Sequence, residues 1–573
     1  MKKGTYILII VLIFFLIAAA AVLSLLYFEL SPSPVRVPAH SYIEIDLSGD
    51  LQEYTAPDFW SRLFLPTRQL SLYDLWMNIR KAKADPRVDT LLFRLGYLSC
   101  NWAKVSEIRD AVLDFRKSGK QAYAYIDEAP DFDKEYFLAT ACDRIILHPM
   151  GWLGINGIGG TVPFFKNALD KLGIQAEFEH VEQYKTATNM FTEKGFTPAH
   201  KEMMESLYGD IFAEYVKTVA AARNKSEEEV RRLIDQAFFQ GESAVKAGLV
   251  DDLMYDDELD KLLDDRGWKS KRVSFDDYTR VKLSSFGLDQ GKKIALIYGQ
   301  GPIVSGEGFF RMMGGATLAR WIRQARMDST ISAIVFRVDS PGGSAIASDV
   351  IWREVALAKK TKPFVVSMSD VAGSGGYWVS MAAHKIVAQP QTLTGSIGVL
   401  TGKFNLAGLA EKLGITTEKL IYGKEADVFS PLRGLTDEEK RLFKQQILWI
   451  YDQFLAKVAQ GRNMSQEDVD KIGRGRVWTG RQAKELGLVD ELGGLPKALE
   501  LAKKLAGIPL EAEVKLVIWP KKVSFWGSIF GRKESEVLTL PGLDKNTKKI
   551  LAVIERLEGD RIWALMPFWF APN

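Results

Sequence analysis

A serine between glycines stands where a strand passes into a helix. Residues 372–376 read Ala-Gly-Ser-Gly-Gly, after an apolar, β-branched stretch at 364–368 and before a helical pattern that starts at Tyr377. In such a turn the N–H of Ser374 and the first helical N–H groups face a bound molecule, and they suit a developing negative charge. The pattern indicates a nucleophile. Taken alone, however, these residues are more often a glycine-rich turn with an incidental serine.

A second glycine pair also follows a predicted strand. Residues 339–344 read Asp-Ser-Pro-Gly-Gly-Ser directly after a strand that ends at Val338. Adjacent glycines let backbone N–H groups approach a ligand closely, as an oxyanion hole requires. Gly342 and Gly343 are therefore candidate oxyanion donors. A β-turn with proline at its second position is the alternative.

A nucleophilic serine needs a base, and the sequence offers one histidine and two lysines. His384 lies ten residues beyond Ser374, roughly 15 Å along a helix, which is too far for a direct proton transfer. A lysine must be neutral to act, so its pKa must fall from about 10.4 towards 7, a cost of roughly 4–5 kcal/mol. Lys185 lies among small and apolar residues, whereas Lys424 has Glu425 and Asp427 beside it. A solvated surface site is the ordinary expectation for any single lysine.

The composition excludes several classes of function. The chain has 573 residues, 47% of them hydrophobic and 26% charged, with a net charge of +3. Such a charge spread over this length argues against a nucleic-acid-binding surface. The two cysteines, Cys100 and Cys142, can form neither a disulfide framework nor a thiolate metal site, and the five histidines have no metal-ligand spacing. The sequence calls for no cofactor and no metal.

The N-terminus predicts a membrane anchor. After Lys2 and Lys3, residues 6–28 are uncharged and strongly apolar, long enough to span a bilayer core of about 30 Å. A cleaved signal peptide is the alternative, but its apolar region is normally shorter. With residues 1–5 held in the cytoplasm by the positive-inside rule, all later residues face outward. Residues 29–42 carry three prolines and are expected to be an extended linker.

An internal repeat organises the rest of the chain. Four segments recur in order and at nearly constant spacing: 89–95 with 332–338, 141–146 with 382–387, 223–226 with 462–465, and 241–251 with 480–490. This predicts one duplicated domain, with a first unit at 43–290 and a second unit at 291–515. Residues 516–573 lie outside the repeat and are rich in aromatics. A packing arm and a membrane-interface contact are equally good hypotheses for them.

The predicted elements alternate strands with helices. In the second unit we expect strands near 294–298, 333–338, 364–368 and 386–388. Helices are expected near 345–360, 375–384, 404–413, 436–461 and 481–486. This alternation with glycine-rich turns predicts an α/β fold with a mostly parallel sheet in each unit.

The two units differ at the residues that could do chemistry. Gly342 and Gly343 align with Leu98 and Ser99 of the first unit, and Ser374 aligns with Asp133. A purely structural duplication has no reason to differ at these points in particular. The second unit is thus predicted to hold the nucleophile.

Several motifs together resemble the signal peptide peptidase A (protease IV) family in its long, duplicated form. They are SPGGS at 340–344, AGSGGYW at 372–378, TGSIGV at 394–399, QYKTA at 183–187 and TGRQAKELGLVD at 479–490. The resemblance implies a crotonase- and Clp-protease-like fold and a Ser/Lys dyad of Ser374 and Lys185. It further implies an oxyanion hole from Gly342 or Gly343 and the serine N–H, and a homotetramer with sites at junctions between repeats. Lys424 keeps a second base possible, and the C-terminal extension has no counterpart that we can assign.

These expectations define a function. We expect a membrane-anchored serine endopeptidase that degrades apolar peptides, chiefly cleaved signal peptides, at a bacterial inner membrane with its catalytic units in the periplasm or outside the cell. One alternative is the same chemistry on a specific membrane or envelope protein. Another is a crotonase-fold scaffold or acyl-binding protein without hydrolase activity.

Overall fold

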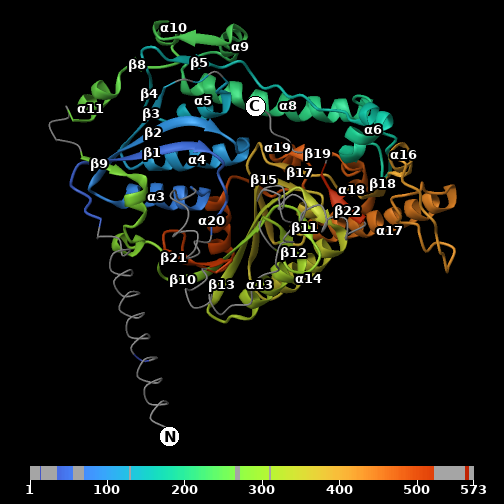
Figure 1. Ribbon diagram of the computed structural model, residues 1–573. Helices are drawn as coiled ribbons and strands as arrows, with labels where there is room; N and C mark the ends of the chain where they lie inside the picture. The colour runs from blue at the N-terminus through green and yellow to red at the C-terminus, as the bar shows by residue number, and fades with distance from the viewer. Residues whose placement is uncertain are drawn as a thin grey trace, which may run out of the picture.

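The chain folds into two α/β units, each built on a parallel sheet, as Figure 1 shows. The computed structural model describes Ile13 and residues 35–55, 70–127, 129, 131–264, 271–308, 311–521 and 562–566. The first unit runs from blue to green in the figure and the second from yellow to red-orange. The predicted α/β class with mostly parallel sheets is confirmed.

The sheet of the first unit contains six parallel strands. Their order across the sheet is β8 (Asp252–Leu253), β4 (Arg144–Leu147), β3 (Gln121–Ile126), β2 (Val88–Leu98), β1 (Ser41–Gly49) and β9 (Lys271–Ser274). Strand β2 is buried over residues 90–93 and β3 over residues 122–126, as expected for parallel strands covered on both faces. Strand β1 already begins inside the predicted linker 29–42.

The second unit repeats this sheet strand for strand. The order is β20 (Glu491–Leu492), β16 (Lys385–Ala388), β15 (Phe364–Gly373), β13 (Ile331–Ser340), β10 (Lys292–Gln300) and β21 (Val514–Trp519), again all parallel. A small antiparallel pair accompanies each sheet: β5 (Trp152–Gly154) with β7 (Phe238–Gln240), and β17 (Leu393–Gly395) with β19 (Val477–Thr479). The identical order confirms the duplication, and the second sheet runs past the predicted boundary at 515.

Residues that recur in the sequence make the same contacts in both units. Arg223 pairs with Asp251 at 2.8 Å in the first unit, and Arg462 pairs with Asp490 at 2.9 Å in the second. Asp251 accepts a hydrogen bond from the backbone N–H of β4, and Asp490 accepts one from β16. The repeat therefore preserves the ion pair that holds a long helix to the sheet.

Helices cover both sheets. In the first unit they are α3 (Leu72–Ala84), α4 (Trp102–Arg116), α5 (Asp133–Ala139), α6 (Lys166–Leu172), η1 (Thr186–Thr188), α7 (Asn189–Thr192), α8 (Pro198–Ala222), α9 (Glu227–Gln236), α10 (Glu242–Lys246), α11 (Asp256–Asp264), α12 (Phe275–Thr279) and η2 (Leu283–Phe286). In the second they are α13 (Gly315–Met327), α14 (Ala345–Lys359), α15 (Gly375–Trp378), α16 (Ala407–Lys412), α17 (Asp437–Arg462), α18 (Gln466–Ile472), α19 (Gly480–Glu485) and α20 (Leu495–Leu505).

The predicted helices of the second unit are found, with one correction. The helix expected at 375–384 ends at Trp378. The chain must turn back early because β16 begins at Lys385, and the His384 N–H already donates to the carbonyl of Phe364, the first residue of β15. The periodicity of the sequence does not reveal that β16 must begin at Lys385 to pair with β15.

A third sheet joins the two units. Its order is β12 (Met313–Gly314), β11 (Ile303–Val304), β14 (Gly342–Ser344), β22 (Ile562–Leu565), β18 (Leu400–Asn405) and β6 (Gln175–His180). Strand β6 belongs to the first unit and pairs antiparallel with β18 of the second over six residue pairs. In Figure 1 this arm of the first unit, with α6 and α8, reaches across to α16 and β18. The arm carries the chain that follows β6 onto the second unit.

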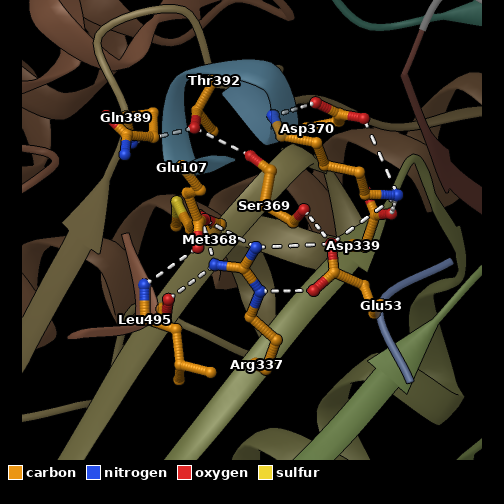
Figure 2. Close-up of polar contacts among 12 residues, drawn as sticks. Glu53, Glu107, Arg337, Asp339, Met368, Ser369, Asp370, Gln389, Thr392 and Leu495 are labelled. Atoms are coloured by element: carbon orange, nitrogen blue, oxygen red, sulfur yellow. Dashed lines mark hydrogen bonds and ion pairs between the residues drawn. The ribbon is translucent and has the colours of Figure 1, made fainter. Parts of the chain in front are cut away.

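A buried ion network lies where the units meet (Figure 2). The guanidinium of Arg337, on β13, contacts Glu53 at 2.7 Å and Glu107 at 2.6 Å, and both glutamates come from the first unit. Lys104 of α4 reaches Asp339 at the end of β13 at 2.8 Å. Arg337 is 1% exposed. The network ties α4 to the carboxyl ends of the central strands of the second sheet.

Several predictions fall on residues that the structure does not describe. The anchor at 6–28, apart from Ile13, and most of the extension at 516–573 lie outside the described residues. Within the described ranges, no helix is both long and apolar enough to cross a membrane.

Candidate active site

Ser374 lies at the junction of β15 and α15, in an unusual backbone conformation. Its φ is 54° and its ψ is −110°, a region that costs a non-glycine residue free energy and is concentrated at functional sites. The side chain is fully buried. One expectation is wrong: the serine N–H donates to the carbonyl of Gly395 at 2.8 Å, because pairing between β15 and β17 continues one residue further. This N–H is therefore occupied.

Lys185 meets Ser374 across the junction between the units. It follows β6, on the arm that the first unit lays over the second. Its Nζ lies 2.7 Å from the Ser374 Oγ although the two residues are 189 positions apart in the chain. The structure thus brings together the two residues that the sequence singled out as nucleophile and base.

The surroundings of Lys185 favour its neutral form. The side chain is fully buried, and burial, the cause of the shift, holds the pKa of its ammonium well below the ordinary lysine value. Its polar neighbours are uncharged: besides Ser374, the Nζ contacts the Ser396 carbonyl at 3.1 Å and the Ser396 Oγ at 3.0 Å. A neutral amine in this place can accept a proton from the serine hydroxyl.

Two glycines make room for the lysine. A Cβ built on Gly475 would lie 2.5–2.6 Å from the N, Cα and Cβ of Lys185, and one on Gly398 would lie 3.2 Å from its Cδ. Gly475 also has a φ of +82°. The backbone of the second unit therefore forms a slot that fits this lysine closely.

Ser396 is a site residue that the reasoning from sequence missed. Its φ is 48°, and its N–H donates to the Arg476 carbonyl at 2.7 Å, which turns the hydroxyl toward Lys185. A signal was present, because Ser396 lies in the TGSIGV motif quoted above. The motif helped to identify a resemblance, but no role was assigned to its serine.

The glycine pair lies beside the nucleophile. Gly342 and Gly343 begin β14 with φ values of 101° and 153°, and a Cβ on Gly343 would lie 2.0 Å from the Ile303 carbonyl oxygen. A Cβ on Gly375 would lie 3.1 Å from Gly342 Cα, so this loop packs against the first turn of α15. The Gly342 N–H donates to the Ser340 Oγ at 3.2 Å.

The rival bases lie elsewhere. The Lys424 side chain is 84% exposed and pairs with Glu425 at 3.6 Å. His384 accepts from the N–H of Phe364 at 3.1 Å, at the opposite end of β15 from Ser374. Ten residues of strand (Phe364–Gly373) separate that end from the serine by roughly 30 Å. The structure brings neither residue to the nucleophile.

In the first unit, carboxylates fill the equivalent region. Asp133 begins α5, as its sequence partner Ser374 precedes α15, and it accepts hydrogen bonds from the N–H groups of Asn156 and Gly157 at 3.0 and 3.1 Å. Glu135 accepts from the N–H of Leu98 at 2.6 Å. Burial raises the pKa of Asp133 to about 7. These acids occupy backbone donors around the turn that corresponds to the one carrying Ser374.

Comparisons with known proteins identify a family. The model of peptidase family S49 matches residues 114–268 and 356–509, one segment in each unit. Serine protease SPPA, chloroplastic, of Arabidopsis thaliana is 36% identical over 91% of this chain and 77% of its own length. Protease 4 of Haemophilus influenzae is 33% identical over 76% and 73%.

Two solved structures are similar to part of the chain. A mutant of the 1510-N membrane-bound stomatin-specific protease is 16% identical, with 40% of this chain and 99% of that chain covered and a TM-score of 0.26. A mutant of ClpP1 from Listeria monocytogenes is 16% identical, with 36% and 94% covered and a TM-score of 0.24.

Proposed function

Because this chain belongs to peptidase family S49 and is a serine protease, we propose that Ser374 is its nucleophile and Lys185 its general base. The observation that carries the proposal is the 2.7 Å contact between Lys185 Nζ and Ser374 Oγ in a fully buried site. A nucleophile and a base within hydrogen-bond reach are what acyl transfer requires.

The reaction follows from these two side chains. Neutral Lys185 takes the proton of the Ser374 hydroxyl as its Oγ attacks a peptide carbonyl carbon. The resulting ammonium then gives that proton to the leaving amine as the C–N bond breaks, which leaves an ester on Ser374. Water, deprotonated by the same lysine, attacks the ester carbon; the bond to Ser374 Oγ breaks, the carboxylic acid leaves, and the lysine returns the proton to Oγ. The hydroxyl of Ser396 holds the amine toward Ser374 throughout.

The oxyanion donors are assigned from the backbone around Ser374. The serine N–H is already used, so the proposal rests on Gly342 and on the first turn of α15. The first N–H groups of any helix lack helical acceptors, and those of α15 follow the nucleophile directly. The Gly342 N–H donates to the Ser340 Oγ at 3.2 Å, a contact that a charged oxygen can replace. Gly343, the next residue of β14, is assigned a different role: its backbone hydrogen-bonds to an extended peptide.

The finer features implied by the resemblance remain part of the proposal. They are a crotonase- and Clp-protease-like fold, apolar peptides and cleaved signal peptides as substrates, an anchor at 6–28 in a bacterial inner membrane, and a homotetramer. The buried, largely uncharged site favours apolar peptides over acidic or basic ones.

The test compares hydrolysis of a leucine-rich, signal-like peptide by the wild-type chain and three variants. Ser374→Ala and Lys185→Ala are expected to lose activity by roughly 10³-fold or more. Lys424→Ala is the matched control, because its side chain lies in solvent. Activity of Lys185→Ala with loss in Lys424→Ala would overturn the choice of base, and full activity of Ser374→Ala would overturn the mechanism.

A further inference from the structure

A strand from the far C-terminus lies beside the candidate site. Strand β22, which precedes Met566, is inserted between β14 and β18 in the third sheet. It pairs antiparallel with β14, placing Leu565 opposite Gly342 and Trp563 opposite Ser344, and it pairs antiparallel with β18. One edge that it covers is therefore the glycine loop next to the nucleophile. We call residues 562–566 the tail strand.

Met566 continues this strand up to the nucleophile turn. Its N–H donates to the Pro341 carbonyl at 2.7 Å, and its side chain is 5% exposed. A Cβ built on Gly373 would lie 2.6 Å from the Met566 Sδ and 3.1 Å from its Cβ. Gly373 is the residue before Ser374, so Met566 lies against the backbone that carries the nucleophile.

The ladder has the form of a bound peptide. Hydrogen-bonded pairs alternate along an antiparallel ladder, so the pair of Met566 with Pro341 makes Gly343 and Ala564 the next one. An extended peptide that adds a strand to an exposed edge is held in this way, by main-chain hydrogen bonds with pockets for alternate side chains. The tail strand thus uses the edges that a peptide substrate needs.

We propose that the tail strand is an intramolecular inhibitor that occupies the peptide-binding groove, with Met566 as the residue whose carbonyl faces Ser374. The inference rests on the proposed function of that serine. A tethered strand competes at the high effective concentration of its own linker, so it lowers the rate with any free peptide. Substrates must displace it before Ser374 can attack them.

The residue after Met566 explains why the tail is an inhibitor and not a substrate. Pro567 follows Met566 in the sequence, so in the proposed register the bond that Ser374 would attack joins Met566 to a proline nitrogen. Proline has no N–H, and its ring restricts both its own φ and the conformation of the residue before it. Lys185 must protonate this ring nitrogen for the C–N bond to break. The tail can therefore bind in the register of a substrate and resist cleavage.

The first experiment removes the tail strand. A chain that ends at residue 561 should cleave the signal-like peptide with kcat/KM about tenfold or more above that of the full chain. A chain that ends at Pro567 keeps the tail strand and is the matched control, with the activity of the full chain expected. If removal of the tail strand leaves kcat/KM unchanged or lowers it, or if the control is activated equally, the inference is wrong.

The second experiment leaves the chain length unchanged. Pro567→Ala turns the bond after Met566 into an ordinary peptide bond, so the chain should cleave itself there and release residues 567–573, detected by intact mass. In the same step Ser374 would gain an ester to Met566, and water would return the free serine. The double variant with Ser374→Ala should stay intact. An uncleaved Pro567→Ala chain would overturn the register that places Met566 at the nucleophile.

A binding measurement separates this inference from the proposed function. A fluorescent peptide with the sequence of residues 561–566 is titrated into Ser374→Ala chains with and without the tail strand, and anisotropy reports binding without catalysis. Binding about tenfold or more tighter to the shortened chain is expected, and equal binding would overturn the inhibitor. If no chain hydrolyses peptides, the proposed function fails. The anisotropy measurement still shows whether the tail strand occupies the peptide-binding groove.

Discussion

At the scale of single residues, the site depends on what surrounds one amine. Lysine is a poor base at neutral pH because it is normally protonated. Lys185 is buried among hydroxyl and carbonyl groups, and burial lowers the pKa of its ammonium. Lys424, the corresponding residue of the second unit, is exposed to solvent and has a carboxylate neighbour, Glu425. The difference between these two lysines is one of environment, since their chemistry is the same.

This environment predicts the pH dependence of the enzyme. Below the pKa of Lys185 the amine is protonated and cannot accept the serine proton, so kcat/KM should rise with pH and level off above that pKa. Because burial lowers the pKa well below 10.5, the plateau should be reached well before that pH. The check is a kcat/KM profile on the wild-type chain, with Lys424→Ala giving the same curve. A rise centred near the ordinary lysine pKa would contradict the buried base.

At the scale of elements, the lysine is positioned by loops that have little regular structure. The segment after β6 places Lys185 against Gly475, and the N–H of Tyr184 donates to the Arg474 carbonyl at 3.2 Å. The turn of the second unit that includes Gly475 therefore sets the depth to which the first unit inserts its base. A small displacement here moves Nζ away from Ser374.

Gly475→Ala tests this positioning. The new Cβ would collide with the Lys185 backbone, and a displacement of about 1 Å costs roughly 10²-fold in rate. We expect kcat/KM to fall by about that factor, as measured by peptide hydrolysis. Gly507→Ala is the control: Gly507 also has a positive φ, +63°, but nothing lies within 4 Å of its added Cβ. Equal losses in both variants would mean that backbone strain, and not the displacement of Lys185, explains the result.

At the scale of the whole molecule, the site exists only because two units are held together. The nucleophile comes from one unit and the base from the other, and the buried network of Arg337, Glu53 and Glu107 fixes their interface (Figure 2). Burial raises the pKa of Glu107 to about 7, while Arg337 opposes that shift. A buried guanidinium is required to keep two such carboxylates together.

Arg337→Met is expected to destabilise the chain by about 3–5 kcal/mol, because it removes the cation that pairs with Glu107 and leaves Glu53 with only Lys104, at 3.6 Å. The unfolding midpoint in denaturant measures this loss, and kcat/KM should fall with it as the interface loosens. As the control, Lys246→Ala removes an exposed ion pair with Glu242, and it should change the unfolding midpoint and kcat/KM little. A stable and fully active Arg337→Met chain would show that the network does not hold the site.

Much of the fold could be predicted because it repeats in the sequence. The paired segments around Arg223 and Arg462 indicated a duplication, and apolar runs such as 333–338 indicated parallel strands. The end of α15 and the occupied N–H of Ser374 could not be predicted, because both depend on how β15 pairs with its neighbours. Ser396 was missed for a similar reason. Its hydroxyl faces Lys185 because its N–H is bonded to the Arg476 carbonyl, a contact between residues far apart in the chain.

The sequence by itself determined the chemistry that is available. A serine in a glycine turn, a lysine free of acidic neighbours and a repeat that keeps only one nucleophile are all local facts, and local physics suffices to interpret them. Only the tertiary structure decided which lysine reaches the serine and which strand lies beside it. Residues 185, 374 and 566 are far apart in the chain, and their meeting depends on sheet pairing and on the packing of one unit against the other, which no local pattern encodes.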